Sequence, residues 1–273
     1  MPETSFPLAP TGTGPASGAF VKRPAGLLLG WSRQPGIPRG AGAMFRSASV
    51  VGAGRVGTAV HARLCERLPE ARLTGRELAC DGADLIVLCV PDRHVAEVAR
   101  SLPPGPWVAH TSGATRLGSL EPHRRRFALH PLQTFQRGLG PEQLDGAWGA
   151  VSAESDESRE AGFALAHLLG LEPFELDDEE RSVYHAAATV AAAFLSTLHG
   201  AAADLMDAAG APPEALEPLM RRTMDNGFAP TGPFVRGDRD TVTAHIGAIR
   251  ARRPQLEPLY RVLADATERL AMR

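Results

Sequence analysis

A short apolar and β-branched run leads directly into the glycine turn Gly52-Ala-Gly54-Arg-Val-Gly57, and apolar residues then recur at helical spacing. In such a strand–turn–helix unit the first glycine permits the tight turn, the second lets a pyrophosphate approach the backbone, and the third lets helix pack on strand. The N–H groups at the helix start also attract phosphates. The sequence therefore predicts a dinucleotide-binding unit, with a purely structural turn as the alternative.

Strand and helix patterns alternate from this unit to residue 176. Asp84–Val90 is a continuous apolar run, typical of a central parallel strand that is covered on both faces. Further strands are expected at 71–74, 107–109, 127–129, 148–152 and 172–176, with helices at 56–68, 95–102 and 157–169. This order predicts an α/β fold of the Rossmann type, a doubly wound parallel sheet over residues 44–176.

The pattern from Asp177 onward is helical throughout. Helices are expected at 179–209, 212–226, 241–252 and 255–272, which predicts an all-α C-terminal domain over residues 177–273. The boundary falls at an acidic stretch, Asp177–Glu180, and negative charge suits the start of a helix.

Residues 1–43 differ in composition from the rest of the chain. They are rich in Pro, Gly, Ser and Ala, show no periodicity, and contain Lys22, the only lysine of the 273 residues. We expect a disordered tail without function, and we interpret Met44 as the initiator.

Composition argues against several classes of partner. The net charge of −2 with interspersed signs predicts no nucleic-acid-binding face. The most apolar segment, Ala186–Leu205, is interrupted by polar residues, which favours a core helix over a membrane span. Three cysteines without CxxC spacing indicate reduced thiols and no metal site. We expect a cytoplasmic protein without membrane or nucleic-acid partners.

The end of the second strand bears on the choice of dinucleotide. The sequence there is Thr74-Gly-Arg76-Glu77; Arg76 favours the 2′-phosphate of NADP, whereas Glu77 would favour the ribose of NAD. We expect NADP, and NAD stays open. The other expected cofactor contacts lie in the glycine turn and after the next two strands: Gly52, Gly54, Arg55, Val56, Gly57, Val90, Pro91, Thr111 and Ser112. Ordinary turn chemistry is the alternative for Ser112.

Three histidines are candidate acid/base groups. His130 precedes Pro131 at the expected carboxyl end of a strand, His110 has the same position one strand earlier, and His185 stands beside Tyr184 on the long helix. Hydride chemistry needs a group that exchanges protons near neutral pH. The absence of lysine after Lys22 excludes a Schiff base in the folded part.

The loop Thr231–Asp238 contains two further candidates. Arg236 is expected to bind an anionic group of the substrate or to contact a subunit. Asp238 can orient that group, or it can cap the helix that follows.

Six motifs in this order, "GAGRVG", "VLCVPD", "HTSGA", "HPLQTF", "YHAAA" and "TGPFVRGD", resemble a family of Rossmann-like proteins with a C-terminal helical domain of unknown function. This family is related to pyrroline-5-carboxylate reductase, deazaflavin-dependent NADP reductases and the 6-phosphogluconate dehydrogenase-like superfamily. The resemblance implies a nicotinamide cofactor and a helical domain that builds a dimer, but no substrate. The pair His130-Pro131 is also similar to an element of prephenate dehydrogenases, where the histidine contacts substrate.

The chain departs from this pattern in two ways. The catalytic lysine that some relatives carry on the long helix has no counterpart here. Ala191–Ala193 stand where the family tends to carry an asparagine. We therefore predict a homodimeric NADP-dependent oxidoreductase that acts on a small carbonyl, imine or hydroxy substrate. The alternative, which both departures favour, is a non-catalytic NADP-binding sensor or interaction protein.

Overall fold

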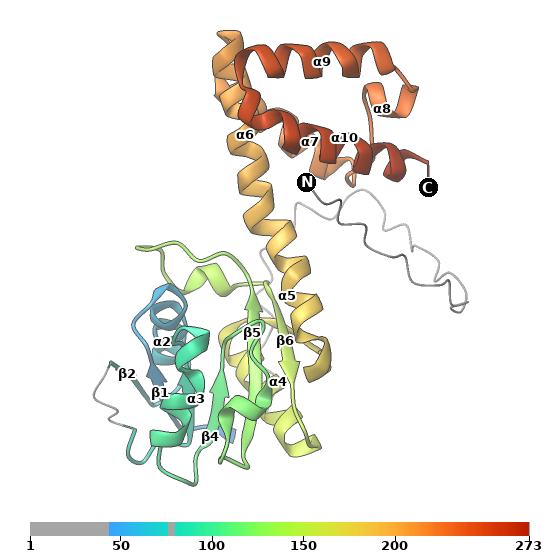
Figure 1. The fold of residues 1–273 in the computed structure, drawn as a ribbon. Helices are drawn as coiled ribbons and strands as arrows, with labels where there is room; N and C mark the ends of the chain where they lie inside the picture. The colour runs from blue at the N-terminus through green and yellow to red at the C-terminus, as the bar shows by residue number, and fades with distance from the viewer. Residues whose placement is uncertain (1–43, 76–79, 273) are drawn as a thin grey trace, which may run out of the picture.

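The computed structural model describes residues 44–75 and 80–272 and shows a seven-stranded sheet with helices on both faces, followed by a helical part (Figure 1). The strand order is β2-β1-β3-β4-β5-β6-β7, and every neighbouring pair is parallel except β5 and β6. The predicted Rossmann-type fold is confirmed. The strands are β1 Ser47–Val51, β2 Glu70–Thr74, β3 Leu85–Leu88, β4 Trp107–His110, β5 Arg126–Leu132, β6 Trp148–Ser152 and β7 Glu172–Glu175.

One strand pair differs from the expected parallel arrangement. Residues 133–147, which join β5 to β6, contain only the short 3-10 helix η2 (Pro141–Leu144). Parallel neighbours are usually joined by a crossover that contains an α-helix, and a connection without one suits an antiparallel pair. The connection from β6 to β7 runs through a full helix, and that pair is parallel.

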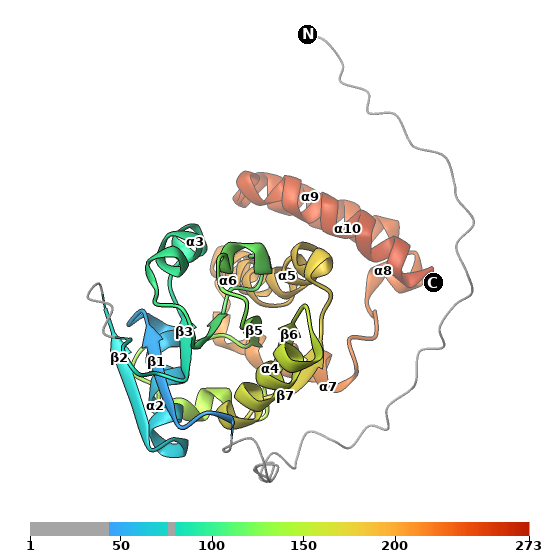
Figure 2. The ribbon, with the colours of Figure 1, turned by 90° about the horizontal axis from the view of Figure 1, so that it is seen from below.

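Helices cover the two faces of the sheet as distinct layers (Figure 2). On one face α2 (Arg55–Arg67) and α4 (Asp156–Leu169) share a buried core with alternate residues of the strands. On the other face lie α3 (Asp92–Ser101) and the 3-10 helix η1 (Leu117–Leu120). Strand β3 faces both cores and is at most 1% exposed along its length, as its continuous apolar run predicted.

The C-terminal part is built on one long helix that rises from the sheet (Figure 1). It comprises η3 (Asp178–Glu180), α5 (Arg181–Thr189), the π-helical turn η4 (Val190–Phe194) and α6 (Leu195–Ala209), and it ends at Gly210 with a φ of 73°. The remaining helices are η5 Pro213–Ala215, α7 Leu216–Asp225, α8 Pro233–Arg236, α9 Arg239–Arg252, η6 Pro254–Leu256 and α10 Glu257–Ala271. The short α8 was not expected from the sequence, which predicted a loop there.

The glycine turn joins β1 to α2 by close backbone contact. Gly52 has a φ of 112°, and a Cβ at this position would lie 2.6 Å from the carbonyl oxygen of Cys89. A Cβ at Gly57 would overlap the carbonyl oxygen of Gly52, whereas a Cβ at Gly54 would meet nothing within 4 Å. Gly52 and Gly57 are therefore required for packing, and Gly54 leaves open space in front of the helix.

Stability measurements on two alanine variants test this division of roles. We expect Gly57→Ala to lower the free energy of unfolding by about 1–3 kcal/mol, because α2 must move away from β1 to admit a methyl group. Gly54→Ala is the matched control, since its φ of −77° suits alanine and nothing obstructs the side chain. Denaturant titration gives both values, and equal stability of the two variants would contradict this account.

Candidate functional site

The carboxyl ends of β1, β3 and β4 bring the predicted cofactor residues to one edge of the sheet. Helix α2 begins directly after the turn, with Gly54 as N-cap and without a side-chain cap. The first turn of any helix leaves N–H groups without intrahelical partners. Together with the open space at Gly54, these groups form a cradle that fits a phosphate.

The other predicted cofactor residues have different degrees of exposure. Arg55 is the exposed first residue of α2, and Val56 behind it is half-buried. Val90 and Thr111 are half-buried, and Pro91 is the exposed N-cap of α3. Arg76 lies outside the described residues.

Ser112 is buried and occupied by its own turn. Its hydroxyl oxygen accepts a hydrogen bond from the backbone N–H of Thr115 at 3.0 Å, and its O–H donates to Thr115 Oγ1 at 2.8 Å. The geometry thus favours the turn alternative for this side chain.

A group of aromatic side chains forms between β5 and α5. His130 lies inside β5, which continues to Leu132 and does not end before Pro131 as expected. Its Nδ1 is 2.8 Å from the hydroxyl of Tyr184, and its ring meets the ring of His185 edge-on, with centroids 5.8 Å apart. Sequence reasoning assigned no role to Tyr184; its only signal was its place beside His185.

These side chains line a cavity of about 580 Å³, which we call the histidine cavity. The other lining residues from α5 and η4 are mainly alanine and include the Ala191–Ala193 triplet. A π-helical turn is rare and often marks a functional site. The lining residues are His130, Leu132, Gln133, Thr134, Tyr184, His185, Ala187, Ala188, Thr189 and Ala191–Ala193.

Burial sets the protonation of the two hydrogen-bonded groups. It lowers the pKa of His130 to about 4, with further contributions from His185 and Arg181, so the imidazole is neutral at pH 7. Burial raises the pKa of Tyr184 to about 12, so the phenol keeps its proton. The Tyr184 hydroxyl can therefore donate to Nδ1, and this assignment places the imidazole proton on Nε2.

His110 lies deeper than the cavity. It is 0% exposed, and within residues 44–75 and 80–272 neither ring nitrogen has a hydrogen-bond partner. Burial, with the nearby Arg181 charge, lowers its pKa to about 3. His110 does not line the cavity, so this geometry does not support proton transfer from it to a bound molecule.

The two predicted substrate residues lie in the helical part, on elements that do not line the cavity (Figure 1). Arg236 is the last residue of α8. Asp238 caps α9: its carboxylate accepts hydrogen bonds from the N–H of Thr241 at 3.1 Å and from the Thr241 hydroxyl at 2.8 Å. Capping of this helix is one of the two roles that the sequence predicted for Asp238.

Family comparisons identify both parts of the chain. Residues 40–134 match the model of the Rossmann-like domain, and residues 148–267 match that of a domain of unknown function, DUF2520. The chain thus combines a Rossmann-like domain with DUF2520, which confirms the resemblance predicted from the six motifs. A search of curated proteins found no match.

Solved structures share the fold over most of this chain. A Bacteroides fragilis protein, provisionally named an NADP oxidoreductase, is 20% identical with a TM-score of 0.68 over 83% of this chain and 99% of its own. Pyrroline-5-carboxylate reductase of Streptococcus pyogenes is 16% identical, with a TM-score of 0.54 over 82% and 97%. An imine reductase of Streptomyces aurantiacus is 16% identical, with a TM-score of 0.56 over 82% and 93%.

The buried His110 generates a prediction about stability and pH. Because its folded pKa lies below the unfolded value, the unfolded chain binds more protons as the pH falls below about 6.5, and stability is lost on the acid side. We expect His110→Leu, which removes this titration and breaks no hydrogen bond, to keep the stability of the parent at pH 7 within about 1 kcal/mol.

Thermal unfolding of both proteins between pH 7.5 and pH 5 measures the difference. The melting temperature of His110→Leu should fall less than that of the parent over this range. Parallel curves would show that His110 titrates normally and would contradict its burial in the neutral form.

Proposed function

We propose that this chain is an NADP-dependent oxidoreductase that moves a hydride between the nicotinamide and a small carbonyl, imine or hydroxy substrate in the histidine cavity. The observation that carries the proposal is the position of the paired His130 and Tyr184 in a cavity on the sheet that also presents the glycine cradle. Open α/β sheets bind ligands at the carboxyl ends of their strands. The names of the structurally similar oxidoreductases support the same reaction class.

The cradle residues would hold the cofactor, which supplies the hydride when bound. The first-turn N–H groups of α2 face the pyrophosphate position, and Gly54 leaves the space that phosphate oxygens need. The exposed Arg55 would add a charge-assisted contact. Arg76 remains our candidate for the 2′-phosphate and for the preference for NADP over NAD.

His130 would polarise and protonate the substrate. With Nδ1 accepting from Tyr184, the Nε2–H can donate to a carbonyl oxygen or an imine nitrogen in the cavity. As the substrate is reduced, this Nε2 proton would move to its heteroatom, the Tyr184 proton would move to Nδ1, and the half-buried Tyr184 oxygen would regain a proton from water. In oxidation the same path would run in reverse: Nε2 would accept the substrate proton while Nδ1 returns a proton to Tyr184, which releases one to water. His185, which lines the cavity from α5, would orient the substrate.

The alanine wall favours a second candidate function. Apart from Tyr184 and His185, the helix side of the cavity is lined by five alanines and one threonine, which offer few groups that could bind a polar substrate. A protein that binds NADP as a sensor and does not turn it over needs no such groups.

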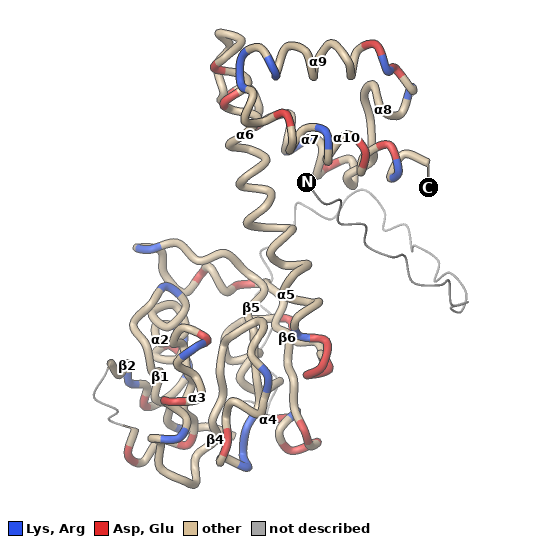
Figure 3. The backbone as a smooth tube through the Cα atoms, viewed as in Figure 1, with Lys and Arg blue, Asp and Glu red and all other residues tan. Residues whose placement is uncertain are grey.

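We further propose that the chain forms a homodimer through its helical part and works in the cytoplasm. The helix Asp178–Ala209 is long and apolar enough by composition to span a membrane, and its most apolar stretch is not buried. It carries no charged residue from Ser182 to Ala203 (Figure 3). Val183, Val190 and Phe194 are 54–69% exposed, and a second copy of this helix would cover them.

The same arrangement would give Arg236 a role. Within one chain α8 does not reach the histidine cavity, so Arg236 can bind an anionic substrate group there only if a second copy supplies it. Asp238, which caps α9, would support that loop.

A kinetic comparison tests the catalytic proposal. NADPH oxidation is followed with a panel of carbonyl and imine compounds; for a compound that reacts, His130→Ala should lower the rate by about 10²–10⁴-fold and Tyr184→Phe by less. His61→Ala, which removes a half-buried histidine of α2 that does not line the cavity, serves as the control and should retain full activity. An unchanged rate in His130→Ala would remove His130 from the mechanism, and NADPH binding without any turnover would favour the sensor.

Sedimentation velocity tests the dimer. We expect a particle of two 28.9 kDa chains, which Phe194→Glu dissociates because it places charge in the covered face. Leu73→Glu, an equally drastic change on the edge strand β2, should leave the dimer intact. A monomer in the parent protein would contradict the proposal, and its binding to lipid vesicles would assign the apolar helix to a membrane.

A further inference from the structure

Arg181, the first residue of α5, is the largest fully buried side chain among residues 44–75 and 80–272, and it lies where the helical part begins. Its Nε donates to the carbonyl oxygen of Thr115 and its Nη1 to Ser152 Oγ, each at 2.8 Å, and its Nη2 donates to the carbonyl oxygen of Ser112. No carboxylate of the described chain lies within ion-pair distance of this guanidinium. It is a buried cation held only by neutral acceptors.

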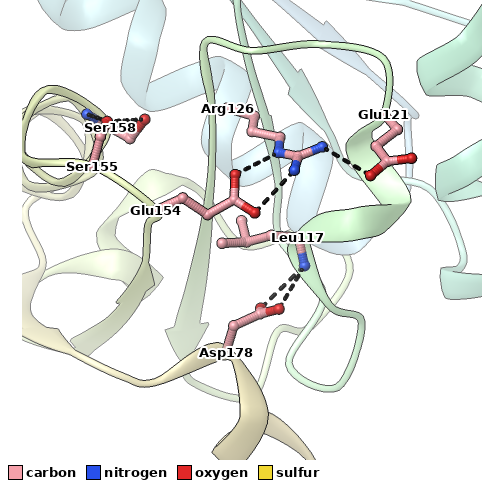
Figure 4. Close-up of polar contacts among 7 residues, drawn as sticks. All are labelled: Leu117, Glu121, Arg126, Glu154, Ser155, Ser158 and Asp178. Atoms are coloured by element: carbon pink, nitrogen blue, oxygen red, sulfur yellow. Dashed lines mark hydrogen bonds and ion pairs between the residues drawn. The ribbon is translucent and has the colours of Figure 1, made fainter.

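The segment that follows β4 is anchored to the start of the helical part by two further contacts. The carboxylate of Asp178 accepts the backbone N–H of Leu117 at 3.0 Å (Figure 4), and Glu179 pairs with Arg116 at 2.7 Å. Ser152, which accepts from Arg181, in turn donates to the carbonyl oxygen of Leu176 at 2.7 Å. Strand β6, the loop and the helix are thus joined through one guanidinium.

The anchored loop lies close to the histidine rings of the cavity at Gly113. A Cβ on this glycine would collide with the ring of His185 and would lie 3.0 Å from Nε2 of His130. The position of Gly113 therefore limits how the two imidazoles can turn. Arg181 binds the carbonyl oxygens on either side of it, those of Ser112 and Thr115.

The charge of Arg181 acts on the same rings. It contributes to the lowered pKa values of His130 and His110, and no anion touches it to cancel this effect. The other titratable groups around it are Tyr184 and His185 on α5, with Asp178 of η3 and Asp92 of α3 as the nearest sources of negative charge. An arginine remains charged even when burial lowers its pKa.

We propose that Arg181 is the positioning residue of the histidine cavity: its hydrogen bonds hold Gly113 against the rings of His130 and His185, and its guanidinium places a buried positive charge without an ion-pair partner beside them. Arg181 acts through these groups and touches no bound molecule. The inference concerns geometry and charge, so it does not depend on the proposed hydride transfer and can fail or succeed independently of it.

NMR titration of the histidine rings tests the charge. In the full chain, labelled at histidine, the His130 signal is assigned by its loss in His130→Gln. We expect Arg181→Met, which removes the charge but keeps an unbranched side chain of similar length, to raise the pKa of His130 by about half a unit or more. Ser152→Ala is the matched control, because it removes one hydrogen bond and no charge, and its His130 pKa should equal that of the parent.

Arg181→Lys separates charge from geometry. Lysine retains the charge but cannot fill three fixed donor positions, so the His130 pKa should stay low while amide hydrogen exchange of residues 112–116 becomes several-fold faster. A folded Arg181→Met with an unchanged His130 pKa overturns the inference, and so does an Arg181→Lys with unchanged loop exchange. If Arg181→Met does not fold, the exchange result for Arg181→Lys decides the question.

Discussion

The contact between Gly57 and the carbonyl of Gly52 is the constraint on which the arrangement of this molecule depends. Because no Cβ separates them, α2 begins directly at the end of β1 and points its N-terminus along the carboxyl edge of the sheet. β4 and β5 are parallel neighbours in the same sheet, so His130 and the loop after His110 come to that side as well. The close backbone contact and the strand order thus place the open N-terminus of α2 and a cavity with a histidine–tyrosine pair on the same sheet.

The protonation of the histidines in and near the cavity is set by their burial and by the lack of a negative charge in contact with them among the described residues. The charge of Arg181 acts on both His130 and His110, and within the described residues no hydrogen bond or ion pair joins a carboxylate to any of the three. Under these conditions the imidazoles are most stable in the neutral form. Small alanine side chains on the long helix leave the space of the cavity beside the His130–Tyr184 pair, and the same composition makes the exposed faces of this helix apolar. The histidine cavity and the exposed apolar surface of the long helix therefore both follow from the alanine-rich sequence of this helix.

Local patterns were sufficient to predict much of the fold. The glycine turn, the apolar run of β3 and the end of the long helix at Gly210 all have signals within a few residues. The extension of β5 through Pro131 had no such signal. β4 pairs with β5 only as far as Ala128, so beyond that point the missing N–H of proline costs no bond on that side, while pairing with β6 continues to Leu132.

The residues that complete the site were the hardest to predict, because their contacts span long stretches of sequence. Tyr184 meets a histidine 54 residues earlier, and Arg181 binds a loop more than 60 residues away. Nothing in the composition near Arg181 distinguishes it from a solvated arginine at a helix start, and only its burial in the folded chain does. His110 shows the opposite case. Its position at the end of a strand predicted an acid/base role, whereas β4 lies between β3 and β5 and the His110 ring is fully buried outside the cavity.

Calorimetric titration with NADPH and NADH tests the central claim most directly, since every other function assigned to the cavity depends on a dinucleotide in the glycine cradle. The account predicts one NADPH bound per chain, with tighter binding than NADH, and at least tenfold weaker binding in Gly54→Ala, whose methyl group enters the phosphate space without unfolding the turn. Failure of the parent protein to bind either dinucleotide would contradict the account and would make the glycine turn a purely structural feature.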